Sequence, residues 1–160
     1  MFDLPLSGPG LTVITGPNGS GKSTAARALE ARVAGAWLLS AESQQAFYEA
    51  QLAADEANFS QGVDTSVTVG ALLGQPGRGH PLCAAFRLEP LWERRYRQLS
   101  TGESRKVLLL QAVLRAPALL ILDDPFEGLD RAAHAELAQA IVHVAERLPV
   151  VVVGTFAEPP

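Results

Sequence analysis

The nine residues from Gly16 to Thr24, GPNGSGKST, constrain the fold of this chain more than any other segment. They fit the pattern G-x-x-x-x-G-K-[ST], which is meaningful where it joins a strand to a helix. The apolar run Leu11 to Thr15 predicts a buried strand before the motif. The segment Ser23 to Val33 predicts a helix after it, with Gly35 just past its end. This arrangement indicates an α/β fold with a parallel sheet.

The glycines of this segment suit it to binding phosphate. They let successive backbone N–H groups turn inward around phosphate oxygens, and the helix N-terminus adds partial positive charge. Lys22 is expected to reach the β- and γ-phosphates of a nucleotide, and the Ser23 hydroxyl to ligate Mg²⁺. The alternative is a glycine-rich turn with a solvated lysine, although such a match arises by chance in about one chain of this length in a hundred. The predicted contacts come from the whole motif: Gly16, Pro17, Asn18, Gly19, Ser20, Gly21, Lys22, Ser23 and Thr24.

Two consecutive carboxylates follow a second apolar strand, predicted from Ala118 to Leu122. Because such a strand delivers its last residues to the carboxyl edge of the sheet, Asp123 is expected to meet the magnesium through water. Asp124 is placed to orient or deprotonate an attacking water. The alternative is that the Asp-Pro sequence here only turns the chain.

Composition narrows the class of protein. The chain has 160 residues, 48% of them hydrophobic, which predicts one soluble domain with an ordinary core. A formal charge of −4 argues against binding nucleic acid through a broad basic surface. Cys83 is the only cysteine, so no internal disulfide can form, and a free buried thiol is expected. The longest apolar runs fall far short of the roughly 20 residues of a membrane span, so a cytoplasmic location is predicted.

The remaining segments complete an alternating pattern of strands and helices. Further strands are predicted at Trp37 to Leu39 and Pro149 to Val153, and a helix is expected to follow the N-cap Asp130. In the middle third a helix is predicted from Gln44 to Ala57. Residues 58–65 and 74–81 are dense in turn-forming residues, and a loop is predicted at 74–81. Short helices are expected at 66–73 and 82–88.

The segment Leu99 to Glu103, LSTGE, precedes a predicted helix. It fits a capping box, with Ser100 at the N-cap and Glu103 at N3. A capping box does not account for Gly102, which costs helix propensity while freeing backbone amides to face a phosphate. The segment therefore predicts a second anion-binding helix terminus, set apart from the first.

With these motifs in order, the sequence resembles an ATP-binding cassette (ABC) ATPase. It is similar in particular to ModF-type molybdate-transport and photorepair ATP-binding proteins. The segments that carry this similarity are the LSTGE sequence at Leu99 to Glu103, the residues 104–106 after it, and residues 123–130 and 43–49. The resemblance implies a P-loop NTPase fold in a single domain, with a three-layer parallel-sheet core at about 1–43 and 104–160 and a small helical subdomain at about 44–103. The motifs that carry it are Gly16 to Thr24 as Walker A, Leu99 to Glu103 as the signature, Leu119 to Asp124 as Walker B and Gly128 to Asp130 as the D-loop.

The resemblance also implies ATP and Mg²⁺ as cofactors and a head-to-tail dimer, with a second copy or another cassette. Ser100 and Gly102 of one subunit would close over the γ-phosphate held by Lys22 of the other. A separate anion-binding helix terminus has an obvious use across such an interface. Gln44 would be the glutamine near the magnesium and the attacking water; Gln45, or a merely solvated helix residue, is the alternative.

Three departures from the family pattern stand out. The usual Asp-Glu at the end of Walker B is Asp123-Asp124 here, so the base position is one methylene shorter, and a misplacement of about 1 Å can cost on the order of a hundredfold in rate. The segment 153–158 carries no switch histidine, and His80, His134 and His143 are expected at the surface. Only Phe2 is available to stack on adenine from an early strand. Slow hydrolysis is the hypothesis that follows.

Three functions remain open at this point. The first is a motor subunit that hydrolyses ATP for a transporter, in association with transmembrane permease subunits at the inner face of the membrane. The second is an ATP-gated dimerisation switch with little turnover. The third is a soluble repair-type ABC protein in which Arg94, Arg95, Tyr96 and Arg97 touch nucleic acid, although a solvated charged helix end explains those residues better.

Overall fold

The computed structural model describes residues 8–59 and 67–155 of the chain. A four-stranded parallel sheet forms its centre, in the order β1-β4-β3-β2. The strands are β1 (Gly10–Thr15), β2 (Ala36–Ser40), β3 (Leu119–Asp123) and β4 (Pro149–Gly154). β3 and β4 are central and buried along almost their whole length, whereas β1 at one edge is only half-buried. The α/β fold with a parallel sheet is therefore confirmed.

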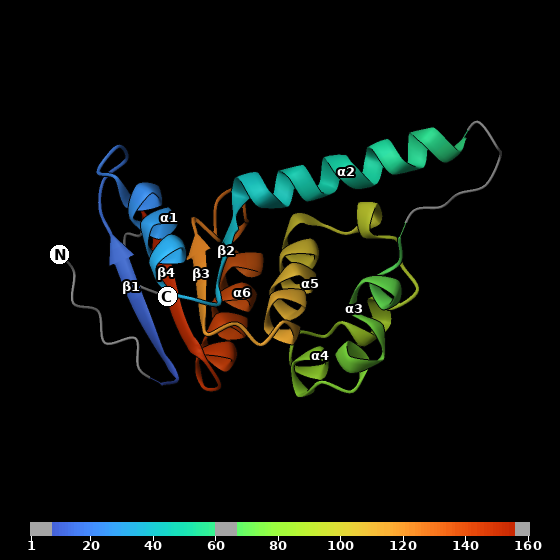
Figure 1. Ribbon diagram of the computed structural model, residues 1–160. Helices are drawn as coiled ribbons and strands as arrows, with labels where there is room; N and C mark the ends of the chain where they lie inside the picture. Colours follow the sequence, from blue (N-terminus) through green and yellow to red (C-terminus); the bar gives the residue numbers. More distant parts are fainter. Residues whose placement is uncertain (1–7, 60–66, 156–160) are drawn as a thin grey trace.

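The two faces of the sheet are covered by different helices, which produces the three layers (Figure 1). Successive side chains of β3 and β4 point to opposite faces, as the pleat of a strand requires. Leu119, Ile121, Val151 and Val153 pack with Ala26 of α1 (Lys22–Arg32), whereas their neighbours on the other face pack with α5 (Thr101–Leu114) and α6 (Arg131–Ala145). Because both faces are covered, these strands read as continuous apolar runs in the sequence.

The middle third of the chain is helical among its described residues. α2 (Ala41–Phe59) leaves the end of β2 and runs out past α5 (Figure 1). α3 (Val69–Arg78) and α4 (Pro81–Ala85) follow, then the short 3-10 helices η1 (Glu89–Leu91) and η2 (Tyr96–Gln98). α3 packs on α5, and Val69, Leu82, Cys83 and Phe86 belong to the same apolar core as α5 and α6. The buried thiol expected at Cys83 is confirmed.

The loop predicted over 74–81 is wrong in part, because its glycines and proline serve a kinked helix. Gly74 adopts φ 62 and interrupts α3, and the chain resumes a helical turn that contains Pro76. Gly77 is needed for packing, since a Cβ there would lie 2.5 Å from the Leu73 Cβ. The turn-forming residues therefore mark a kink within a helix that packs on α5, and not a loop.

Two neighbouring predictions also need correction. The helix expected at 82–88 is α4, which ends at Ala85, because Arg87 turns the chain with φ 56. Asn58 and Phe59, expected in a turn-rich segment, lie in α2. Residues 60–65 of that segment, Ser66 at the start of the expected 66–73 helix, Phe2, and residues 156–158 lie outside the described residues. The division into a core and a helical subdomain at about 44 and 104 stays a prediction.

The topology gathers the predicted site residues at one edge of the sheet. In parallel strands the carboxyl ends meet at the same edge, where ligands of open α/β sheets bind. The glycine-rich loop follows β1, Asp123 ends β3 and pairs in register with Ser40 of β2, and Thr155 follows β4 directly.

Candidate nucleotide-binding site

The loop between β1 and α1 takes the shape that its glycines allow. Gly19 and Gly21 have φ 81 and φ 86, the left-handed region that a side chain disfavours. Gly16 is required for a different reason, since a Cβ there would lie 2.9 Å from the Ser20 Oγ. The loop therefore curls tightly back on itself before the helix begins, with Ser20 N–H donating to the Pro17 carbonyl over 3.2 Å.

Lys22, the first residue of α1, lies inside this curl with only 8% of its surface exposed. Its ammonium donates to the Gly16 and Pro17 carbonyls, each over 3.0 Å. A buried ammonium needs carbonyl oxygens of this kind as acceptors, because burying an unpaired charge costs a large free energy. The carbonyls thus hold the positive charge at the mouth of the loop, where a phosphate would bind.

The N-terminus of α1 is left without a side-chain cap. Gly21 is its N-cap residue, no described side chain accepts a hydrogen bond there, and the first turn holds no acidic residue. A helix end in this state presents unsatisfied N–H groups and partial positive charge to an incoming anion.

Asp123 at the end of β3 is buried, and its Oδ1 atom has no hydrogen-bond partner among the described residues. Burial raises the pKa of this carboxyl, a hydrogen bond from Ser23 opposes that rise, and the neighbouring Asp124 charge adds to it. A buried, unpartnered carboxylate oxygen beside a hydroxyl is a donor set that suits a hard divalent cation. Ser23 and Asp123 therefore fit the Mg²⁺ predicted from the sequence.

This donor set is small, and that also suits magnesium. Across residues 8–59 and 67–155 there is no cluster of three or more His, Cys, Asp or Glu side chains that could hold a metal alone. Mg²⁺ is usually bound by one or two protein ligands together with waters and substrate phosphates. The metal would therefore be expected to bind together with a nucleotide.

Asp124 follows in an unusual backbone conformation. Its φ is 46, its N–H donates to the Val153 carbonyl over 2.7 Å, and its Oδ1 accepts a hydrogen bond from the Thr155 N–H over 3.3 Å. Aspartate tolerates positive φ better than most residues. The carboxylate of Asp124 is thus held by the residue after β4.

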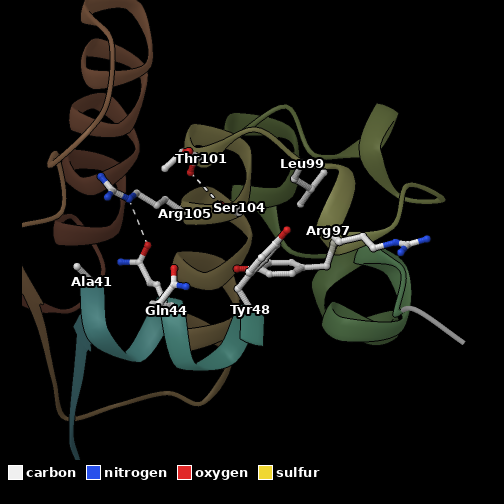
Figure 2. A pocket seen from close by; sticks show the side chains of 10 residues that line it. Ala41, Gln44, Tyr48, Arg97, Leu99, Thr101, Ser104 and Arg105 are labelled. Carbon is white, nitrogen blue, oxygen red and sulfur yellow. Dashed lines mark hydrogen bonds between the residues drawn. The ribbon is translucent and has the colours of Figure 1, made fainter. Parts of the chain in front are cut away.

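The Gln44 side chain points across the space between α2 and α5 (Figure 2). Its Oε1 accepts a hydrogen bond of 3.2 Å from the Arg105 Nε, whereas Gln45 donates to Glu49 along the surface of α2. Gln44, Gln45 and Arg105 line a cavity of about 370 Å³ together with Tyr48, Thr101 and Ser104. Of the two glutamines, Gln44 is half-buried and Gln45 is exposed, and the predicted role of Gln44 beside the metal and the water stays a prediction.

The N-terminus of α5 carries the capping box that the sequence indicates. The Ser100 Oγ accepts from the Glu103 N–H over 3.2 Å, and the Glu103 carboxylate accepts from the Ser100 N–H over 2.7 Å. Gly102 has a packing role that the sequence did not reveal, since a Cβ there would lie 3.1 Å from the Ala133 Cβ of α6. Ser100 itself is exposed.

Arg105 is a site residue for which the sequence predicted no role. It is buried, donates to the Pro125 carbonyl as well as to Gln44, and so joins α5 to α2 and to the turn after Asp124. Burial lowers its pKa, which the nearby Glu127 charge opposes. The only signal in the sequence was an arginine on the face of α5 that also carries Leu108 and Leu109.

The arginine-rich segment before α5 is largely used within the fold. Arg94 pairs with Glu103 over 3.2 Å and donates to the Gln98 carbonyl, while Tyr96 is buried edge-to-face against Phe47. Burial raises the pKa of Tyr96 to about 12. The contacts of Arg94 and Tyr96 leave little of this segment as a separate basic surface.

The three histidines were all expected at the surface. His134 and His143 are exposed. His80 is half-buried, and it caps α4 by accepting a hydrogen bond from the Leu82 N–H.

Fold and site together define a P-loop nucleotide-binding cassette. The chain belongs to the ABC transporter family, whose model matches residues 3–127. It is 36% identical to the ABC transporter ATP-binding protein ModF of Escherichia coli strain K12, over 91% of this chain and 34% of that protein. It is 32% identical to the zinc import ATP-binding protein ZnuC of Haemophilus ducreyi, over 91% of this chain and 60% of ZnuC. The chain thus spans about a third of ModF and three fifths of this ZnuC.

Solved structures agree on the fold. A nucleotide-free ATP-binding cassette from an ABC transporter superposes with a TM-score of 0.65 at 15% identity, covering 95% of this chain and 72% of that one. An inward-facing putative metal-chelate type ABC transporter superposes with a TM-score of 0.60 at 18% identity, covering 91% of this chain and 62% of that one. Within the described residues, none of the helices has both the length and the apolar character that crossing a bilayer demands.

Proposed function

We propose that this chain binds Mg·ATP at the loop Gly16 to Thr24 and hydrolyses it slowly, as the ATP-binding cassette of a transporter. The observation that carries the proposal is the uncapped N-terminus of α1 beside the buried Lys22 ammonium, at the same sheet edge as the unpartnered Asp123 oxygen. Amide groups and ammonium would hold the triphosphate, and Ser23 and Asp123 the magnesium. The metal, when bound, would neutralise part of the negative charge on the phosphate groups.

The chain's own groups have distinct tasks in the proposed hydrolysis. Lys22 binds the β- and γ-phosphates, and Asp124 orients the attacking water and accepts its proton at a carboxylate oxygen. Gln44 helps to position that water from the start of α2. In the described conformation the Gln44 oxygen accepts a hydrogen bond from Arg105, so this contact would have to loosen before Gln44 could turn to the metal or the water.

Slow turnover follows from the carboxylate at position 124. Aspartate is one methylene shorter than the glutamate of the family pattern, and the Asp124 Oδ1 already accepts the Thr155 N–H. A phosphate-release assay tests this. Asp124→Asn is expected to abolish turnover without loss of Mg·ATP binding. Asp124→Glu is expected to raise turnover. This variant should be somewhat less stable, because glutamate adopts a φ of 46 less readily than aspartate. Fast turnover that Asp124→Asn leaves unchanged would refute the role of Asp124.

We infer that ATP drives a head-to-tail dimer, with a second copy or another cassette. The start of α5, where Ser100 is exposed and Gly102 is buried, would cover the γ-phosphate held by Lys22 of the partner. The exposure of Ser100 supports this, since a residue that closes over a partner's ligand must be accessible. Light scattering with and without Mg·ATP measures the effect, and dimers that form equally well without nucleotide would contradict it.

The proposed partner is a transmembrane permease, which would place the chain at the inner face of the membrane. The names of the ABC transporter protein ModF and the zinc import protein ZnuC support a transport role. Molybdate is a candidate cargo only through the sequence resemblance to ModF-type molybdate-transport proteins. The second candidate, an ATP-gated dimerisation switch, is favoured by the short reach of Asp124. Co-purification of a membrane subunit supports the motor; ATP-dependent dimers without phosphate release support the switch. DNA-stimulated turnover would instead support the repair-type function, which the internal contacts of Arg94 and Tyr96 disfavour.

A further inference from the structure

Thr155, the first residue after β4, contacts both halves of the proposed site. Its backbone N–H donates to the Asp124 Oδ1 over 3.3 Å. Its hydroxyl lies 3.2 Å from the Gly16 carbonyl and 3.0 Å from the Asn18 Oδ1, both in the phosphate loop. The loop and Asp124 come from strands that are not neighbours along the chain, so one residue joins two segments more than 100 positions apart in sequence.

A threonine hydroxyl carries one proton, so it cannot donate fully to both loop oxygens. It can donate to the Gly16 carbonyl and accept from the Asn18 amide group, if the amide presents its NH₂, since the two ends of an asparagine amide are interchangeable in shape. In both arrangements the hydroxyl contacts the Gly16 carbonyl and the Asn18 side chain. This contact uses none of the backbone amide groups that would bind phosphate.

The Gly16 carbonyl accepts from both Lys22 and Thr155. An incoming triphosphate competes for the Lys22 ammonium, because a phosphate oxygen is a stronger partner than a carbonyl. The Thr155 contact is independent of that competition. It can therefore keep the loop in place when Lys22 turns to the nucleotide.

We propose that Thr155 is a positioning residue that ties the phosphate loop to Asp124, so that the γ-phosphate and the attacking water stay aligned. The proposal rests on the proposed hydrolysis for its catalytic consequence. The tie itself exists without nucleotide and can be tested without it. Thr155 would act through Asn18, Gly16 and Asp124 and has no assigned contact with ATP.

The test compares Thr155→Val, which keeps the shape and the N–H but removes the hydroxyl, with Thr155→Ser, which keeps both polar groups. In the nucleotide-free full chain, hydrogen exchange of the Ser20 amide, which donates to the Pro17 carbonyl within the loop, is expected to accelerate about fivefold in Thr155→Val and to stay near wild type in Thr155→Ser, since Thr155→Val loses one hydrogen bond of ordinary strength. Equal exchange in wild type and Thr155→Val would overturn the tie.

In phosphate release, Thr155→Val is expected to lower kcat about tenfold, with KM for Mg·ATP within about threefold, because alignment is lost rather than binding. Asn18→Ala should lower kcat similarly, and the double variant should lose little more, as expected for residues that share one contact. The proposal would be overturned if the loss of kcat in the double variant equalled the product of the losses in the two single variants. An unchanged kcat in Thr155→Val would also overturn it.

The two proposals fail in different ways. If the wild-type chain binds Mg·ATP but releases no phosphate, the proposed hydrolysis is wrong, and the dissociation rate of a fluorescent ATP analogue then replaces kcat. That rate is expected to rise about threefold or more in Thr155→Val but not in Thr155→Ser. If it does not rise, Thr155 does not position the loop. If Thr155→Val fails to fold, Asn18→Ala and Thr155→Ser carry the same comparison.

Discussion

The two helix N-termini that the motifs mark, those of α1 and α5, are built in opposite ways. α1 begins at a glycine, without a side-chain cap among the described residues and without an acid in its first turn. α5 begins with a complete capping box and carries Glu103 in its first turn. The first turn of α1 has backbone N–H groups that only a ligand or water can satisfy. The second satisfies its own donors.

This difference shows what each terminus can do alone. The start of α1, with Lys22 inside the loop, is preorganised for an anion before any ligand arrives. At the start of α5 a phosphate would compete with the Glu103 carboxylate, which is paired with Arg94. The α5 terminus therefore suits a weaker, secondary contact, such as closure over a nucleotide that another subunit already holds.

The largest expected effect tests the open terminus. Lys22→Ala should weaken Mg·ATP binding about thirtyfold or more, because it removes a charge-assisted contact to phosphate. Titration with a fluorescent ATP analogue measures it. The chain has one other lysine, Lys106, which pairs with Glu136 over 2.8 Å. Lys106→Ala is the matched control and should leave the ATP affinity unchanged. Equal losses in the two variants would show that the effect is one of general stability.

Asp123→Asn separates the metal from the phosphate contacts. The variant should lose about tenfold in the Mg²⁺-dependent part of ATP affinity and keep the affinity measured in EDTA, since Asp123 is expected to act only through the metal. Its melting temperature in EDTA should not fall, because a buried carboxylate that lacks a partner on Oδ1 is costly to keep charged. A large drop in EDTA would mean that the carboxylate has a structural role instead.

Ser100→Ala tests the closed terminus. Loss of the N-cap hydrogen bond should lower the free energy of unfolding by about 1 kcal/mol, measured by urea denaturation. Thr68→Ala removes the equivalent cap of α3, where the Thr68 Oγ1 accepts from the Ala71 N–H over 3.1 Å. The two variants should be similarly destabilised, but only Ser100→Ala should weaken the ATP-dependent dimer. Equal dimerisation in both would remove Ser100 from the interface.

Glu103→Gln gives the smallest effect and the finest comparison. Glutamine can keep the capping box, since either residue serves at N3, but the negative charge near the proposed γ-phosphate site is gone. The dissociation constant of the Mg·ATP dimer should fall about twofold to fivefold. Sedimentation velocity measures it, with Glu93→Gln as the control for a change in net charge. A weaker dimer would show that the Arg94–Glu103 pair supports the interface.

The sequence predicted best where a function needs consecutive residues. The phosphate loop, the strand before it and the capping box at Ser100 are local, so residue spacing alone specifies them. Their existence and placement are confirmed. The kink at Gly74 and the end of α4 at Ala85 could not be predicted in the same way, because they depend on backbone angles at Gly74 and Arg87 that residue spacing does not specify. Turn-forming residues mark such a place without saying whether the chain turns or only bends.

By itself the sequence determined the class of fold, the phosphate loop and the two aspartates after β3, because periodicity and spacing act over a few residues. Only the tertiary structure decided what those groups meet. It brought Thr155 to the phosphate loop, directed Arg105 to Gln44 and pressed Gly102 against Ala133, contacts between segments distant along the chain. Such contacts depend on how strands are ordered and helices are packed, which no local pattern encodes.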